Sequence, residues 1–368
     1  MTAVDEKTSW IRRRPTRAVK VGPLQIGGGA PVSVQTMTKT DTRDIWATVD
    51  EIRRLHIAGA DLVRLAVPDK EAARALKTIV KHSPLPVVAD IHFHHLLALM
   101  ALEAGVHKLR LNPGNIGGEA KVREVVREAK ARGVPIRIGV NAGSLEKDLL
   151  EKVGRVPEAL VESARRHIQI LEDMDFFDIV VSLKASDVPT MVRAYELMAE
   201  VSPYPLHLGV TEAGPGLPGI VKSVAGISHL LAQGIGDTIR VSLTEDAARE
   251  VEVGLEILYA LKLRTKRLEI VACPTCGRVE IDLFKAVREA EEKLQDVQVP
   301  VKVAIMGCVV NGPGEAQEAD VGVAGGNGYA VLFKKGRIVR RVREDEMVDA
   351  LVEAVREIEA EAKKEGAG

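Results

Sequence analysis

Residues 120–140 read AKVREVVREAKARGVPIRIGV and contain the unit from which the fold is predicted. A helical pattern covers Ala120–Arg132, Gly133 follows it, and a β-rich run spans Pro135–Val140. Glycine is favoured where a helix ends in a left-handed C-terminal cap. The stretch therefore predicts a helix that stops at Gly133 and leads directly into a strand, as in a βα repeat.

The same pattern recurs along most of the chain. Gly59, Gly105 and Gly234 also precede β-rich runs. Eight strands alternating with helices favour a (β/α)8 TIM barrel over an open doubly wound sheet, and no strand leads into a Gly-x-Gly-x-x-Gly turn. The predicted strands are Pro31–Thr36, Asp61–Val67, Pro86–Ile91, Lys108–Asn112, Pro135–Val140, Asp178–Leu183, Pro205–Val210 and Thr238–Leu243. The helices predicted between them include Ile45–Ile57, Lys70–Lys81, Pro157–Met174 and Val188–Val201.

The chain changes character after the eighth repeat. We therefore expect an α/β protein with a barrel domain over residues 1–265 and a small α+β domain over residues 266–368. A length of 368 residues agrees with two domains. The second domain is predicted from two strands (Leu268–Ala272 and Val301–Met306), two helices (Ile281–Leu294 and Glu344–Lys363) and a hairpin around Gly325–Gly328.

Composition excludes several classes of function. Lys plus Arg number 51 and Asp plus Glu number 52, so the chain has no charge surplus for nucleic acid or a membrane surface. The longest apolar run, Leu96–Leu102, is too short to cross a bilayer. An odd, low cysteine count argues against structural disulfides and for a reducing compartment, so we expect a cytoplasmic protein.

All three cysteines fall in the second predicted domain. Cys273 and Cys276 form a Cys-Pro-Thr-Cys pair, and thiolates two residues apart can hold one metal centre. Together with Cys308 they leave a four-coordinate site one ligand short. The turn-forming Asn-Gly-Pro-Gly run after Cys308 brings Glu315 back as the candidate fourth ligand.

Three cysteines could also form a structural zinc site or include a redox pair. A structural zinc site normally has a second cysteine pair or nearby histidines, and no histidine follows His229. A thioredoxin-like redox pair would leave Cys308 without a role. The spacing therefore favours an iron–sulfur cluster with three cysteines and one exchangeable oxygen ligand.

Basic residues occur within the predicted barrel strands, where function is expected at the C-terminal ends. A charged side chain inside a barrel is costly unless it is paired or faces an anion. The acidic partners in reach are Asp90 and Glu212, which leave a surplus of positive charge and favour an anion site, with phosphate suited to arginine. The basic residues are Arg64, Arg110, Arg137 and Arg240, with Lys184 and His207.

The loops at the same ends agree with a phosphate site. The glycine-rich segments 112–118 and 214–219 can present backbone amides to phosphate oxygens. Asn141 and Ser242 add neutral donors, Asp90 and His92 form the candidate acid–base pair, and Glu212 is a third candidate. A phosphorylated small molecule beside a cluster with an exchangeable ligand suggests reductive removal of an oxygen, with iron as Lewis acid and electron conduit.

Six motifs closely resemble the 4-hydroxy-3-methylbut-2-enyl diphosphate synthase family. The similarity runs from about residue 12 to residue 350. The motifs are VADIH (88–92), NPGNIG (112–117), RIGVNAGSLEKD (137–148), KASD (184–187), GVTEAG (209–214) and GCVVNGPGE (307–315).

The resemblance implies an oxidoreductase of the methylerythritol phosphate route to isoprenoids. It would open the ring of 2-C-methyl-D-erythritol 2,4-cyclodiphosphate and remove a hydroxyl with two electrons from flavodoxin or ferredoxin. It implies a [4Fe-4S] cluster on Cys273, Cys276, Cys308 and Glu315, with Glu315 displaced by a substrate oxygen. It also implies a head-to-tail homodimer, protonation by Asp90, His92 and Glu212, and a diphosphate held by Arg64, Arg110, Arg137, Asn141, Lys184, Arg240 and Ser242.

Two alternatives remain open from the residues alone. An iron–sulfur hydro-lyase acting on a phosphorylated substrate would use the same anion site without net electron transfer. A non-catalytic electron-carrier or iron-sensing module on a degenerate barrel is the second, and the retained arginines argue against it.

Overall fold

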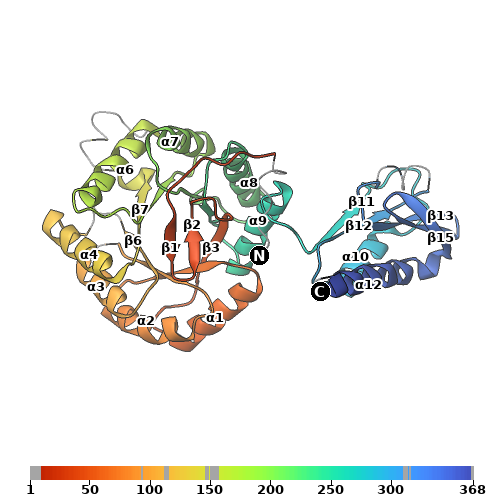
Figure 1. The fold of residues 1–368 in the computed structure, drawn as a ribbon, viewed down its shortest axis with the longest axis horizontal. Coiled ribbons are helices and arrows are strands. Elements are labelled where there is room, and N and C mark those ends of the chain that lie inside the picture. The colour runs from red at the N-terminus through yellow and green to blue at the C-terminus, as the bar shows by residue number, and fades with distance from the viewer. Residues whose placement is uncertain are drawn as a thin grey trace. The chain divides into compact units, whose positions relative to one another are not determined.

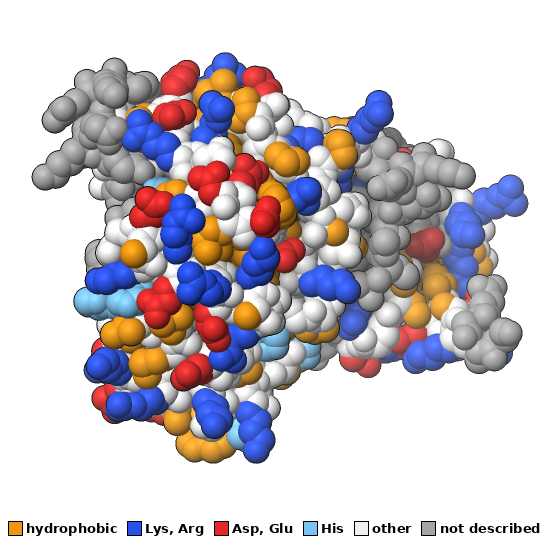
Figure 2. All heavy atoms as spheres, turned by 60° about the vertical axis from the view of Figure 1, so that its left-hand side comes forward, with side chains coloured by type: hydrophobic (Ala, Val, Ile, Leu, Met, Phe, Trp, Pro, Cys, Tyr) orange, Lys and Arg blue, Asp and Glu red, His pale blue; other side chains and the backbone are white. Residues whose placement is uncertain are grey.

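The computed structural model describes residues 10–92, 94–111, 116–145, 149, 157–309, 314 and 316–365. The chain forms two compact units, Met1–Arg264 and Thr265–Gly368. Within the described residues, no helix is long and apolar enough to span a membrane. Figure 2 shows acidic and basic side chains interspersed over one face, as the balanced composition suggests.

The first unit is a parallel barrel, as the sequence predicts. Its eight-stranded sheet has the order β8-β7-β6-β5-β4-β3-β10-β9. A parallel bridge between Val181 in β8 and Leu206, just before β9, joins the two ends of that order. The strands are β3 (Ser33–Met37), β4 (Leu62–Ala66), β5 (Val87–Asp90), β6 (Lys108–Leu111), β7 (Ile136–Asn141), β8 (Ile179–Lys184), β9 (His207–Leu208) and β10 (Thr238–Ile239).

Helices surround the strands in a ring (Figure 1). Several begin at an aspartate that accepts a backbone N–H, as Asp69 does from Ala72 and Asp187 from Thr190. Gly133 ends α4 with φ +63°, which confirms the predicted left-handed cap. The helices are α1 (Ile45–Ile57), α2 (Lys70–His82), α3 (His95–Glu103), α4 (Glu119–Arg132), α6 (Pro157–Glu172), α7 (Val188–Val201), α8 (Gly216–Ala232) and α9 (Ala247–Ala260).

A short antiparallel hairpin that the sequence analysis did not predict precedes the barrel. It consists of β1 (Val19–Val21) and β2 (Leu24–Ile26). Val21 and Ile26 form an apolar cluster with Leu62 and Val88, near the N-terminal ends of β4 and β5. The hairpin therefore covers the barrel at the end opposite to the predicted site.

The second unit confirms the predicted α+β domain. Its sheet has the order β11-β12-β13-β14-β15, parallel from β11 to β13 and antiparallel from β13 to β15. The helices α10 (Leu283–Leu294) and α12 (Met347–Glu365) share one apolar cluster on this sheet, with Ala290 and Leu351 fully buried. The strands are β11 (Leu268–Ala272), β12 (Val301–Met306), β13 (Val321–Gly326), β14 (Tyr329–Lys334) and β15 (Arg337–Arg343). The outermost strand, β15, was not predicted because its arginines interrupt the apolar alternation.

The interior of the barrel contains a layer of polar side chains that have no protein hydrogen-bond partner among the described residues. Lys108 is fully buried there, two residues before Arg110 on the same strand and hence on the same face. Burial, followed by the positive charges of Arg137 and Arg64, lowers the pKa of Lys108 well below 10.5. The unpartnered atoms include the Ser33 and Thr238 hydroxyls, the Gln35 amide, the Lys108 amine and both His207 ring nitrogens.

We predict that Lys108→Met raises the free energy of unfolding at pH 7 by about 1–3 kcal/mol. Below pH 10.5 the unfolded chain carries a charged Lys108, whereas the folded barrel disfavours that charge, so folding is penalised there. The penalty fades as the pH rises towards 10.5. Urea unfolding at pH 6, 7.5 and 9 should show the advantage of the variant shrinking with pH. The exposed Lys77→Met is the control, and an equal or pH-independent effect of both substitutions would contradict the assignment.

Candidate active site

Five barrel strands carry the predicted cations. Lys184 ends β8 and Arg240 follows β10, whereas Arg64 and Arg110 lie within β4 and β6 and Arg137 is the second residue of β7. Arg137 is 1% exposed, and Arg64, Arg110 and Lys184 are also buried. Across adjacent strands, Arg110 pairs in register with Arg137, and Asn141 pairs with Lys184. Arg240 follows β10 directly, and its side chain is 11% exposed. Residues far apart in the sequence thus form one cationic interior.

Asp90 is the carboxylate that anchors one side of this interior. Its Oδ1 lies 3.1 Å from Arg110 Nη1, and its Oδ2 lies 3.5 Å from Arg64 Nε and 3.4 Å from His92 Nε2. Burial alone would raise the pKa of Asp90. The charge of Arg64, the hydrogen bond to His92 and the charge of Arg110 outweigh burial and hold that pKa far below its ordinary value.

The two members of the predicted acid–base pair therefore differ in what they can do. A carboxylate that stays ionised at neutral pH cannot donate a proton, but it can orient its neighbours. The Asp90 side chain is 4% exposed, whereas that of His92 is 52% exposed and lies within hydrogen-bond reach of Arg110 Nη1, at 3.2 Å from Nε2. The geometry makes Asp90 the counter-ion of Arg64 and Arg110, and His92 is the more exposed member of the pair.

Arg137 on β7 and Lys184 on β8 have no carboxylate partner among the described residues. Within the described part of the chain, no acidic oxygen lies within ion-pair distance of either side chain, and Arg137 Nε and Nη1 have no partner. Burial, then the charges of Arg64 and Arg110, lowers the pKa of Arg137. Burial, then Arg137 and Arg240, lowers the pKa of Lys184. Such an environment strongly favours an anion close to these two groups.

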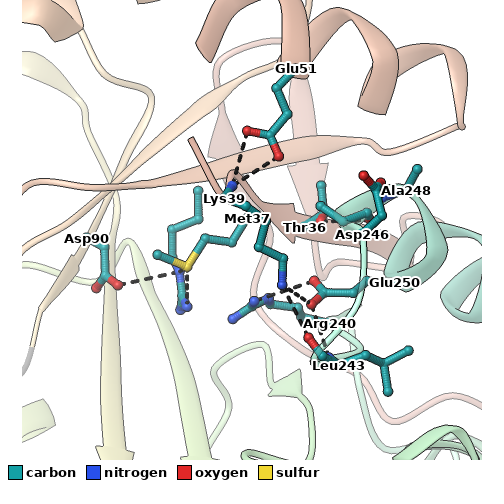
Figure 3. A network of polar contacts seen from close by, with 12 residues as sticks. Thr36, Met37, Lys39, Glu51, Asp90, Arg240, Leu243, Asp246, Ala248 and Glu250 are labelled. Atoms are coloured by element: carbon teal, nitrogen blue, oxygen red, sulfur yellow. Dashed lines mark hydrogen bonds and ion pairs between the residues drawn. The ribbon is translucent and has the colours of Figure 1, made fainter. Parts of the chain in front are cut away.

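A second carboxylate, Glu250 on α9, anchors the other side and was missed by the sequence analysis. Glu250 Oε1 accepts from Lys39 Nζ at 2.8 Å and from the Leu243 backbone N–H at 3.1 Å. Its Oε2 lies 3.5 Å from Arg240 Nη2. In Figure 3, Lys39, Arg240 and Leu243 converge on Glu250. Lys39 could have been identified from the sequence, because it follows β3 by two residues and strand ends were where cations were sought.

The remaining predicted barrel residues lie in the loops of the same end. Asn141 ends β7 and is half-buried, and Ser242 is half-buried between Arg240 and Leu243. Glu212 is exposed in the loop after β9 and has a φ of +53°, a conformation that is uncommon for a residue with a side chain. Four residues of the predicted phosphate loop, 112–115, lie outside the described residues.

In the second unit, two of the three cysteines follow neighbouring parallel strands. Cys273 follows β11 and Cys308 lies two residues after β12, and Ala272 pairs in register with Ile305. The Gly307 N–H donates to Cys273 Sγ over 3.3 Å. Between Cys273 and the exposed Cys276, Thr275 has a φ of +53°.

The sulfurs are not gathered into a common coordination geometry in the structure. Among the described residues, no three His, Cys, Asp or Glu side chains converge as a set of metal ligands. The predicted fourth ligand, Glu315, lies outside the described residues.

Two family models together match most of the chain. A family model described as the GcpE TIM-barrel domain matches residues 16–255, and one described as the GcpE protein C-terminal domain matches residues 269–357. Among solved structures, dihydropteroate synthase of Yersinia pestis has a TM-score of 0.47 at 14% identity, over 67% of this chain and 97% of that chain.

Three curated relatives are 4-hydroxy-3-methylbut-2-en-1-yl diphosphate synthases (flavodoxin). The protein of Symbiobacterium thermophilum is 57% identical over 97% of this chain and 96% of its own length. That of Geobacter sulfurreducens is 57% identical over 94% and 98%, and that of Thermodesulfovibrio yellowstonii is 56% identical over 94% and 99%. The chain belongs to the GcpE family of 4-hydroxy-3-methylbut-2-en-1-yl diphosphate synthases.

Proposed function

We propose that the chain converts 2-C-methyl-D-erythritol 2,4-cyclodiphosphate into 4-hydroxy-3-methylbut-2-enyl diphosphate and water, in the methylerythritol phosphate pathway. The conversion consumes two electrons and two protons, opens the cyclic diphosphate and removes one hydroxyl oxygen. Residues 1–265 bind the substrate and residues 266–368 carry the redox centre. The observation that supports this most directly is the pair of buried cations, Arg137 and Lys184, for which the described residues provide no carboxylate partner.

The balance of charges supports a diphosphate site inside the barrel. Asp90 neutralises part of the Arg64 and Arg110 charge, and Glu250 does the same for Arg240 and Lys39. The surplus is therefore centred on Arg137 and Lys184. Arginine and lysine donors in a site of low dielectric bind phosphate oxygens strongly, with the Asn141 amide and the Ser242 hydroxyl as neutral donors beside them.

Proton delivery falls to the exposed groups of the same end. His92 is held by Asp90 and is open to solvent, so it can take up a proton and pass it to a departing oxygen. Glu212 lies in the loop after β9 and is the second candidate donor. Asp90 contributes by orienting His92, Arg64 and Arg110.

The donor types of the cysteine unit suit a [4Fe-4S] cluster, which Cys273, Cys276, Cys308 and Glu315 would hold. Three thiols are the soft donors such a cluster requires, and a backbone N–H to a cysteine sulfur, as from Gly307 to Cys273, is a contact that stabilises thiolate. When bound, the cluster supplies the electrons and a Lewis-acidic iron at the departing oxygen. Flavodoxin or ferredoxin is the proposed donor of the electrons, and the reducing cytoplasm is the proposed location.

We predict that protein purified without oxygen contains iron and inorganic sulfide in about equal amounts, near four of each per chain. Turnover of the cyclodiphosphate should require a reductant. Stoichiometric zinc without sulfide would contradict the cluster assignment. Turnover without any reductant would instead favour the hydro-lyase, because elimination of water needs no net electrons.

We predict that Gly139→Ala weakens binding of the cyclodiphosphate about tenfold while the barrel stays folded. A Cβ at residue 139 would lie 2.7 Å from Arg110 Nε and 3.1 Å from Arg110 Nη2, so the guanidinium must move. Calorimetric titration and a melting curve measure the two effects. Gly143→Ala is the matched control, because no atom of the described residues lies within 4 Å of a Cβ there. Equal affinities of the two variants for the cyclodiphosphate would show that Arg110 does not contribute to substrate binding.

The head-to-tail homodimer that the resemblance implies is also part of the proposal. Residues 261–267 connect α9 to β11. In such a dimer the barrel of one protomer works with the cysteine unit of its partner.

We predict that Arg137→Leu and Cys308→Ala homodimers are both inactive and that a mixed dimer regains activity. The mixed dimer contains one pairing of barrel and cysteine unit that carries neither substitution. Differently tagged subunits, exchanged and purified through both tags, provide the sample. Absence of activity in that verified mixed dimer would show that each barrel works with its own cysteine unit.

A further inference from the structure

Glu250 lies outside every strand and every motif used above, yet it is among the most buried acidic residues of the barrel. It is 1% exposed and belongs to the first turn of α9. An isolated buried carboxylate is costly, so its position is explained only by the groups that contact it. All of these groups belong to the mouth of the barrel.

The contacts of Glu250 divide between its two oxygens. Oε1 accepts from Lys39 Nζ at 2.8 Å and from the Leu243 N–H at 3.1 Å, and Oε2 lies 3.5 Å from Arg240 Nη2. Lys39 Nζ also donates to the Leu243 carbonyl oxygen at 3.2 Å. Figure 3 shows this arrangement, in which one carboxylate joins a helix, a guanidinium, an ammonium and a loop backbone.

The backbone of residue 243 is therefore held on both sides. Its N–H is bound to Glu250 and its carbonyl to Lys39, which is bound to Glu250 in turn. Ser242 is the preceding residue, and Arg240 begins the same loop. Two of the proposed phosphate donors thus depend on one carboxylate for their placement.

The contact with Arg240 leaves donors available for a ligand. Glu250 meets Arg240 only through Nη2, and Arg240 Nε is buried without a partner within the described residues. A guanidinium has five N–H donors in a fixed fork, so a contact at one end directs the others. On the opposite side, Asp90 contacts Arg64 and Arg110 in the same manner.

We propose that Glu250 is a positioning residue for the diphosphate site, which it serves by fixing the Arg240 guanidinium and the 242–243 backbone. The inference rests on the proposed function, because it assigns a role in binding that substrate. Lys39 acts with Glu250: it completes the hold on Leu243 and offsets the carboxylate charge that would otherwise repel a phosphate.

Electrostatics and positioning give opposite expectations for Glu250→Gln. Removing a negative charge beside an anion site strengthens anion binding if charge alone matters. Under the proposal, the neutral amide no longer forms ion pairs with Arg240 and Lys39, so these groups are less well positioned. Binding of the cyclodiphosphate then weakens about tenfold. Glu250→Asp keeps the charge but shortens the reach, so it should weaken binding as well.

The test uses the full chain without its cluster, so that binding is read independently of turnover. Calorimetric titration with the cyclodiphosphate compares wild type, Glu250→Gln and Glu250→Asp. Glu252→Gln is the matched control, since Glu252 lies on the same helix, is 58% exposed and pairs with Arg249. Melting temperatures show whether a Glu250 variant is unfolded. If one of the two variants is, the affinity of the other variant tests the proposal.

The outcomes distinguish a failure of the positioning role from a failure of the proposed function. Weaker binding in both Glu250 variants, with Glu252→Gln unchanged, supports the positioning role. Unchanged or tighter binding in Glu250→Gln, or unchanged binding in Glu250→Asp, overturns it. A wild-type protein that does not bind the cyclodiphosphate overturns the proposed function itself.

Discussion

The burial of several positive charges inside one barrel is the constraint on which the rest of the structure depends. Moving a guanidinium or ammonium out of water is costly, and the barrel places five such groups within its strands or directly after them. Two carboxylates, Asp90 on β5 and Glu250 on α9, offset part of this charge. The arrangement keeps the side chains ordered while leaving the centre electropositive. The buried charges lower the stability of the fold, and we infer that they are retained because they preorganise the interior for an anion.

Much of this followed from the sequence because the signals are local. A helix, a glycine and a β-rich run repeat along the chain, and an arginine inside such a run is visible without a structure. Lys108 illustrates a signal that was present but not used: it is two residues before Arg110, and the period of two places both side chains on the inner face. Arg137 was identified by the same kind of pattern, and the structure places it fully inside the barrel as the second residue of β7.

The parts that could not be predicted depend on contacts between distant residues. Glu250 belongs to a helix, and Lys39 precedes it by 211 positions, so no strand-end pattern connects them. The hairpin of β1 and β2 consists of strands of three residues each, below the length at which alternation is readable. Likewise, the sequence predicted β11 and β12, but only the structure shows them adjacent and parallel, with Cys273 and Cys308 beyond the same edge.

The hairpin at the N-terminal end of the barrel strands limits how a ligand can reach the barrel interior. Val21 and Ile26 are completely buried against Leu62 and Val88, so the lower end is plugged by hydrocarbon. We therefore expect a ligand that binds beside Arg137 to enter and leave at the C-terminal ends of the strands. Under the proposed function, product would have to leave before the next substrate molecule could bind.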